Sequence, residues 1–66
     1  MTIAILFKSG QLEIYDYVSA VNMEDDRLSF TTDYKMPVTC ITKDLNEIAK
    51  VSVGGIIYYE QGEARI

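Results

Sequence analysis

The sequence has no histidine, no tryptophan, one proline and one cysteine in 66 residues. The single cysteine, Cys40, has no partner for an internal disulfide, and without histidine the chain has no ligand set for zinc. No apolar run approaches the ~18 residues of a membrane span. The apolar stretch Ile3–Phe7 is too short for a signal-peptide core and follows no basic segment. We therefore expect a cytoplasmic protein without metal or cofactor, in which Cys40 stays reduced.

The length allows one domain, residues 1–66, with a small core. The chain has 8 Ile, 5 Val and 5 Thr, together with five Tyr and two Phe. β-branched and aromatic residues at this level favour strands over helices. The formal net charge is −4, which counts against binding to phosphate backbones or to anionic membranes.

The first quarter of the chain predicts a β-hairpin. The apolar run Thr2–Lys8 ends at Ser9-Gly10, a dipeptide typical of a turn. The segment Gln11–Tyr15 then alternates polar and apolar residues, which indicates a strand with Leu12 and Ile14 on one buried face. Between residues 16 and 18 the alternation is lost, and we expect a bend or bulge there that lets one long segment serve two parts of a curved sheet.

A second hairpin follows with a charged tip. A strand from Val18 to Met23 leads into Glu24-Asp25-Asp26-Arg27, and Leu28–Tyr34 returns. The return strand has strict period-two alternation, which places Leu28 and Phe30 on the buried face. Its opposite face carries Ser, Thr and Asp and is expected to meet solvent or a partner.

The second half predicts three more strands and one helical turn. Proline at position 37 marks a connection, after which Val38–Thr42 is a strand with Cys40 as a small core residue. Asp44–Glu47 has the spacing of a capping box, which predicts one or two helical turns near residues 44–50. Gly54-Gly55 suits a type I′ turn between Val51–Val53 and Ile56–Glu60. In total we expect five or six short strands in a small antiparallel meander or SH3-like barrel.

No residue pattern supports catalysis. Cys40 has no histidine to act as its base. The ten acidic residues are scattered over a chain too small to enclose a substrate of the usual pocket size. The cluster Glu24, Asp25 and Asp26 lacks the glycine and the spaced ligands of a calcium loop. A solvated hairpin tip explains this cluster best, and the tip also suits contact with a basic partner surface. We therefore predict no enzymatic activity.

The tyrosines are the most suggestive feature for binding. Tyrosine provides a large contact area with few rotamers and a polar tip, and it is enriched at interfaces. Tyr58 and Tyr59 are adjacent in a strand, so we expect them to face opposite sides of the sheet, one in the core and one exposed or covered by a partner. The alternative is that most tyrosines are ordinary residues at the rim of the core. The predicted binding residues are Tyr15, Tyr17, Tyr34, Tyr58, Tyr59, Glu24, Asp25 and Asp26.

Two parts of the sequence carry a resemblance. The run Phe7–Gln11, and the run Asp44–Ile48 that leads to Val51 and Gly54-Gly55, resemble small uncharacterised β-rich proteins of bacteriophages and mobile elements. The resemblance is one of style over most of the chain and transfers no functional residue. It implies a protein that acts by attaching to a host protein, including as an inhibitor of host defence.

The function expected from the sequence is therefore protein–protein binding. A 66-residue core without disulfide or metal supplies little stability by itself, which favours a homo-oligomer. We expect a two-fold dimer that uses tyrosine and strand-edge contacts, with Ile56–Glu60 as the preferred element. Three alternatives remain open: a nucleic-acid-binding small barrel, an acidic mimic of nucleic acid, and a structural or assembly subunit. The acidic balance disfavours the first, and −4 is a weak charge for the second.

Overall fold

The structure is a computed structural model that describes residues 1–33, 38–60 and 63–64. In this part of the chain it has eight strands and one 3₁₀ turn, η1. In chain order they are β1 (Ile3–Phe7), β2 (Leu12–Tyr15), β3 (Val18–Glu24), β4 (Arg27–Thr32), β5 (Thr39–Asp44), η1 (Leu45–Glu47), β6 (Ile48–Val53), β7 (Ile56–Glu60) and β8 (Glu63–Ala64).

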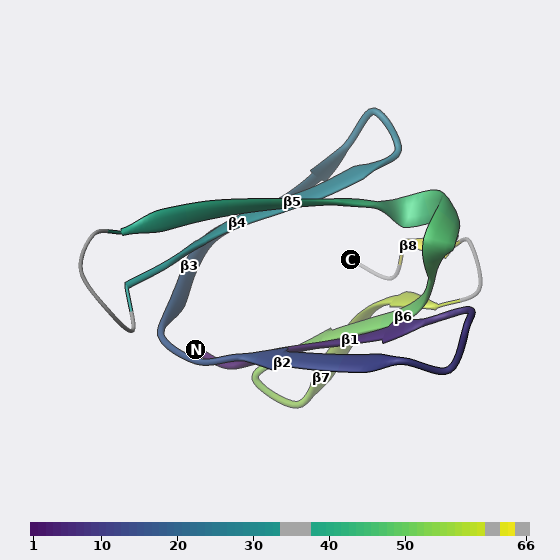
Figure 1. Cartoon of the computed structure of the whole chain (residues 1–66), viewed down its shortest axis with the longest axis horizontal. Coiled ribbons are helices and arrows are strands. Elements are labelled where there is room, and N and C mark those ends of the chain that lie inside the picture. The colour runs from purple at the N-terminus through teal and green to yellow at the C-terminus, as the bar shows by residue number, and fades with distance from the viewer. Residues whose placement is uncertain (34–37, 61–62, 65–66) are drawn as a thin grey trace.

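The strands form two antiparallel sheets that lie one above the other (Figure 1). One sheet has the order β2-β1-β6-β7-β8 and the other has the order β3-β4-β5. The chain passes from the first sheet to the second at residues 16–17, and it returns through η1 between β5 and β6. Because these two connections lie at opposite ends of the molecule, the sheets face each other as a sandwich (Figure 1).

The inner faces of both sheets supply a single core. Leu28 and Phe30 of β4 pack with Ile3 and Ile5 of β1 in the same cluster of buried side chains. The other buried members of this cluster are Val18, Leu45, Ile48, Val51, Val53 and Tyr59. The burial of Leu28 and Phe30 confirms the register predicted from the alternation in β4, whose last described strand residue is Thr32.

The mostly β class and the antiparallel hairpin connections are confirmed, and of the two predicted forms, meander or SH3-like barrel, the closed barrel is not the one that forms. The two sheets do not close on each other. The strand number also exceeds five or six in the described residues, partly because the chain turns sharply at Tyr17, with φ 57°. The turn at residues 16–17 ends β2, and β3 then begins in the other sheet.

The predicted helical turn is confirmed as a single 3₁₀ turn, η1. Asp44 caps η1, and its carboxylate accepts the backbone N–H of Asn46 at 2.9 Å. The turn ends after Glu47, and β6 begins at Ile48, which pairs with Phe7 of β1. Pairing with β1 therefore overrides a helical spacing that would have extended to residue 50. The second glycine turn is confirmed, because Gly54 and Gly55 have φ 59° and 84° as a type I′ turn requires.

Bulges in three strand pairs decide which side chains face inward. Ala20 and Val21 together oppose the single residue Phe30. Ala49 is the extra residue of β6 against β1, and Tyr58 is the extra residue of β7 against β6. Each extra residue reverses the alternation of its strand. The predicted irregularity between residues 16 and 18 is therefore a bend, and the bulge lies further along β3.

Candidate binding surfaces

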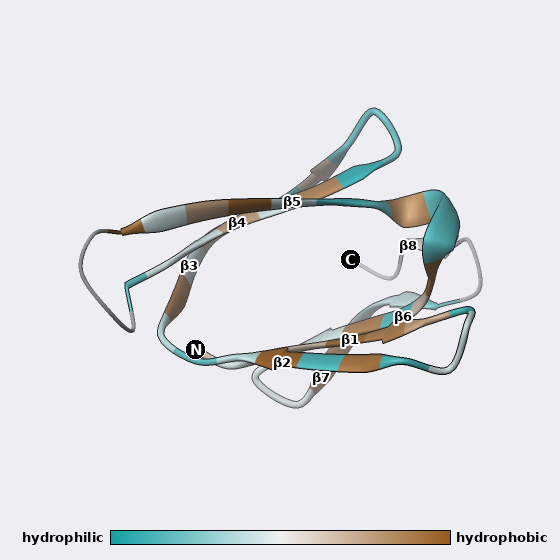
Figure 2. Cartoon of the chain, in the orientation of Figure 1, coloured by the Kyte–Doolittle hydropathy of each residue, from teal (hydrophilic) through white to brown (hydrophobic). Residues whose placement is uncertain are grey.

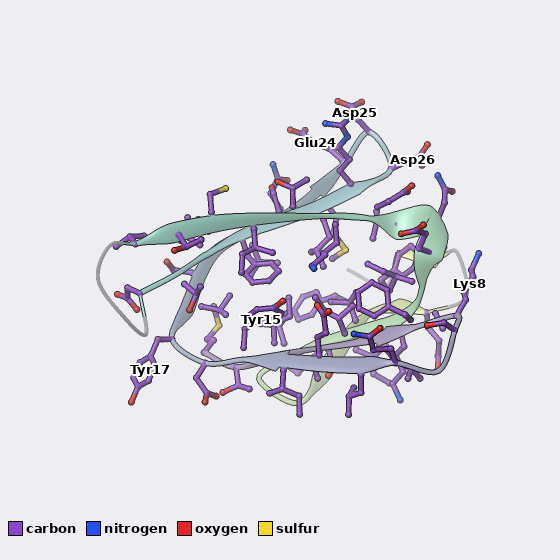
Figure 3. The ribbon with its side chains drawn as sticks, viewed as in Figure 1. Lys8, Tyr15, Tyr17, Glu24, Asp25 and Asp26 are labelled. Atoms are coloured by element: carbon purple, nitrogen blue, oxygen red, sulfur yellow. The ribbon has the colours of Figure 1, made fainter. Side chains whose placement is uncertain are left out.

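Two of the predicted binding tyrosines belong to the interior. The Tyr15 ring packs edge-on against Phe30 with 5.2 Å between ring centroids. Tyr59 is 8% exposed, and its hydroxyl donates to the backbone carbonyl of Leu45 at 3.2 Å. Tyr15 lies between the sheets in Figure 3. Tyr59 is therefore part of the core, and half-buried Tyr15 packs against it.

The other tyrosines have different surroundings. Tyr17 is 60% exposed, and in Figure 3 it points away from the sandwich at the bend after β2. Tyr34 lies outside the described residues. Tyr58 is half-buried and packs against the core, on the same side as Tyr59. The prediction that Tyr58 and Tyr59 face opposite sides is wrong, because the bulge at Tyr58 breaks the alternation on which it depended.

The acidic tip forms as predicted. Glu24 is directly opposite Arg27, and the two turn residues Asp25 and Asp26 have φ 53° and 59°. Positive φ at both positions is the geometry of a type I′ turn, in which aspartate is tolerated. The Asp26 carbonyl accepts the N–H of Leu45 at 2.9 Å, so the tip is fixed against η1. Its three acidic side chains project from the β3–β4 hairpin at the top of the view (Figure 3).

The structure does not gather the predicted residues into one site. The acidic tip and Tyr17 lie at separate places on the surface, and Tyr15 and Tyr59 are interior (Figure 3). Within the described part of the chain, no three His, Cys, Asp or Glu residues are placed to share a metal ion. Cys40 was expected in the core and is exposed. It lies opposite Thr31 on the outer face of β5, because the inward position belongs to Ile41 opposite Phe30.

An exposed apolar surface that the sequence did not reveal lies on the five-stranded sheet. In β2 the expected orientation is reversed: Leu12 and Ile14 are 57% and 60% exposed, while Glu13 and Tyr15 are half-buried. Figure 2 shows the corresponding change between brown and teal along this strand. The cause is the pairing with β1, which sets Tyr15 opposite buried Ile3 and Glu13 opposite buried Ile5.

The register places residues of four strands on this side of the sheet, with the polar residues Ser52 and Lys50 in β6. Leu12 is opposite Leu6, and Ile14 is opposite Ala4. Ala4 is in turn opposite Ser52, and Ser52 is opposite Ile57. Facing residues in a ladder share one side of the sheet. We call this side the apolar outer face, and it comprises Ala4, Leu6, Leu12, Ile14 and Ile57. The compact apolar run of β1 was its sequence signal, because strands that are apolar on both faces are typically covered on both.

The inward-facing polar groups of β2 form a latch between the sheets. The Glu13 carboxylate accepts the Tyr15 hydroxyl at 2.9 Å and forms an ion pair with Lys43 Nζ of β5 at 3.2 Å. The Lys43 ammonium also lies 5.9 Å from the ring centroid of Phe7. These contacts connect β2 and β5, which are the outer strands of their sheets on the same side of the sandwich.

Electrostatics in the latch favours the ionised pair. The hydrogen bond from Tyr15, followed by that from Lys43, lowers the pKa of Glu13 below its ordinary value of 4.5. The hydrogen bond to Glu13 raises the pKa of Lys43. Burial raises the pKa of Tyr15, and its hydrogen bond to Glu13 adds to that effect. All three groups are therefore held in the protonation states that they have at neutral pH.

Comparison of the chain with known protein families, with curated proteins and with solved structures gives no match in any of the three. The described residues also contain no helix with the length and hydropathy needed to cross a membrane.

Proposed function

We propose that this protein is non-enzymatic and acts by protein–protein binding, with the apolar outer face as its main contact surface. The observation that carries the proposal is the exposure of Leu12 and Ile14 beside Leu6, which is 36% exposed. Scattered exposed apolar residues are normal, whereas residues that adjoin in register make a contiguous patch, which is typical of an interaction site.

The first partner is a second copy of the chain. A standard interface buries roughly 800 Å² on each partner, which is about a fifth of the 4526 Å² accessible surface and corresponds to one broad face of a sandwich. The apolar outer face also carries both signs of charge, since Lys50 is directly opposite Leu6 on one side and Glu60 on the other. A two-fold dimer covers two apolar faces at once.

This proposal moves the expected dimer interface. The sequence favoured β7 as an exposed edge strand, but β7 lies between β6 and β8 in the sheet. Tyr59, one of its expected contact residues, is buried. A dimer through the apolar outer face forms by side-chain contacts, so it does not require a free strand edge. A cytosolic location and inhibition of a host protein belong to the same proposal, supported by the exposed free thiol of Cys40 and by the resemblance to phage proteins.

The test compares Ile14→Lys with Val38→Lys, a control that places the same charge on another exposed apolar residue (56%). Light scattering over a dilution series should give twice the 7.5 kDa chain mass for wild type and for Val38→Lys, and one chain mass for Ile14→Lys. Circular dichroism should show all three folded. The same three proteins, immobilised, are then exposed to cell lysate.

The outcomes separate clearly. Loss of self-association, or of a captured protein, in Ile14→Lys alone supports binding through the apolar outer face. A monomeric wild-type protein whose captured proteins are the same as those of Ile14→Lys contradicts the proposal. Turnover of any substrate class by the wild-type protein would contradict its non-enzymatic part.

A further inference from the structure

A hollow lies between the two sheets and is separate from the apolar outer face. Its volume is about 320 Å³, near the lower limit for ligand pockets. Apolar atoms of β3, β6 and β7 line most of it, and its lining residues are Met1, Val21, Asn22, Met23, Val53 and Tyr58. Val21, Met23 and Tyr58 are half-buried and pack against the core from its rim.

Two bulges aim side chains at this hollow. Without the bulge at Ala20, regular alternation from buried Val18 would turn Val21 and Met23 outward. Without the bulge in β7, Tyr58 would point to the outer face. Ala20 has φ 54°, a conformation that costs about 1 kcal/mol or more in a residue other than glycine. Two independent irregularities thus supply side chains to one cavity, which is how bulges re-aim residues beside binding sites.

Among the described residues, β3 is an outer strand whose sheet neighbour is β4. At its first position, the N–H of Val18 donates to Met1 O at 2.8 Å. Further along, Met23 lines the hollow and is followed directly by Glu24 and the acidic tip. At about 3.3 Å per strand residue, the tip begins within roughly 7 Å of the hollow along β3.

We propose that β3 accepts an extended segment of a partner protein, which places one apolar side chain in the hollow and a basic side chain beside the acidic tip. Strand addition supplies main-chain hydrogen bonds, and pockets for alternate side chains supply specificity. Alternate residues of an added strand lie about 7 Å apart, which matches the spacing from hollow to tip. Charge complementarity selects lysine or arginine at the second position, because Glu24, Asp25 and Asp26 outnumber the one cation of the tip, Arg27.

The proposal rests on the proposed function only in that the ligand is a protein segment, and it uses a different surface. It is tested by selecting a library of displayed random octapeptides against the full chain at low salt. Enriched peptides should share an apolar residue with Lys or Arg two or four positions away. One enriched peptide is then synthesised with a fluorophore, and its Kd is measured by anisotropy.

Two matched pairs of variants locate the contact. Asp25→Asn with Asp26→Asn removes two charges at the tip, and Asp33→Asn with Glu47→Gln removes two elsewhere. The tip variant should weaken binding about fivefold at low salt, with the difference shrinking toward 0.5 M NaCl because salt screens exposed charges. Val21→Thr in the hollow should weaken binding about fivefold, whereas the same kind of change at exposed Ile56, Ile56→Thr, should leave it unchanged.

Several results would overturn the inference. They are an absence of enriched peptides, enrichment without the apolar–basic pair, or affinities that do not respond to the tip and hollow variants. Competition by a free fatty acid such as octanoate, with no dependence on the tip, would assign the hollow to a small apolar molecule instead. Binding that is lost in Ile14→Lys and kept in Val21→Thr would place the peptide on the apolar outer face, which would overturn this inference and leave the proposed function intact.

Discussion

The two outer faces of the sandwich differ in chemistry although their inner faces share one core. The outer face of the three-stranded sheet is polar at nearly every position: Ser19, Asn22, Glu24, Arg27, Ser29, Thr31, Cys40, Thr42 and Asp44. The corresponding face of β1 and β2 carries Ala4, Leu6, Leu12 and Ile14. The first face shows that this fold accepts a polar exterior, so the apolar exterior of the second is not a requirement of packing. Something other than the core must account for it.

The largest effect should come from a change that removes the inner support of the polar sheet. Phe30 is 1% exposed and contacts Tyr15 across the sandwich. Phe30→Ala should cost about 3–5 kcal/mol, which is comparable to the whole stability of so small a domain. Urea denaturation followed by circular dichroism should show no cooperative transition. The neighbouring change Thr31→Ala, on the polar outer face, should keep one; equal effects of the two would contradict the assigned register.

The contrast itself can be abolished by making the polar face apolar. Ser29 and Thr42 are directly opposite each other on that face. Replacing both with isoleucine keeps strand propensity and adds a second apolar patch. A molecule with two such faces should associate without closure, so light scattering should report particles well above a dimer. The control Ser29→Thr with Thr42→Ser keeps the face polar and should retain the wild-type mass. An unchanged mass in the isoleucine variant would show that outer-face polarity does not govern association.

A smaller effect is expected where the two sheets are joined through Leu45. Its N–H bonds to the β3–β4 tip, and its carbonyl accepts the Tyr59 hydroxyl from β7. Tyr59→Phe leaves that buried carbonyl without this donor and should lower the free energy of unfolding by about 1 kcal/mol. Tyr58→Phe changes the adjacent, half-buried ring and should alter it by less than about 0.5 kcal/mol. Equal losses of stability for Tyr59→Phe and Tyr58→Phe in urea denaturation would contradict a specific role for Leu45 in joining the sheets.

Alternation in the sequence predicted strands well and faces only in part. It placed Leu28 and Phe30 correctly because β4 alternates strictly and lies between two partners. Alternation failed for β2, where both faces hold large side chains. There the register with β1 decides which face points inward. Alternation also failed for Cys40, because each face of β5 mixes polar and apolar residues. The bulge at Tyr58 leaves no local signal, since it depends on how β6 and β7 pair.

In the candidate site, too, local features were predictable from the sequence and features that depend on strand pairing were not. The acidic tip was predictable, because a charged two-residue turn between alternating strands is a local feature. Tyr17 was predictable only as a tyrosine near a bend. The apolar outer face required the pairing of residues from four strands, two of them more than 30 positions from β2 in the chain. Such a surface is a property of the ladder, and the apolar run of β1 signals only the part that β1 contributes.

The smallest predicted effect concerns Glu13, the charged residue that takes an inward position while Leu12 and Ile14 take outward ones. Its folded pKa is lowered, so its contribution to stability is complete above the ordinary value of 4.5 and is lost as the pH falls through the folded value. Lys43 stays charged throughout this range, because its pKa is raised above the ordinary value of 10.5. The stability that Lys43 contributes is lost only when the pH rises through that folded pKa. Acidification from neutral pH to about pH 3 should therefore release the latch from the Glu13 side alone.

The measurement is the free energy of unfolding in urea across that pH range for wild type, Glu13→Gln and Glu47→Gln. Because the Glu13 and Lys43 side chains are 24% and 28% exposed, the difference at neutral pH should be at most about 1 kcal/mol. Glu13→Gln should lose less stability on acidification than wild type, whereas Glu47→Gln, at an exposed position of η1, should follow wild type. Parallel curves for all three proteins would mean that the latch contributes nothing. The reversed orientation of β2 would then rest on its pairing with β1 and on the contact of Tyr15 with Phe30.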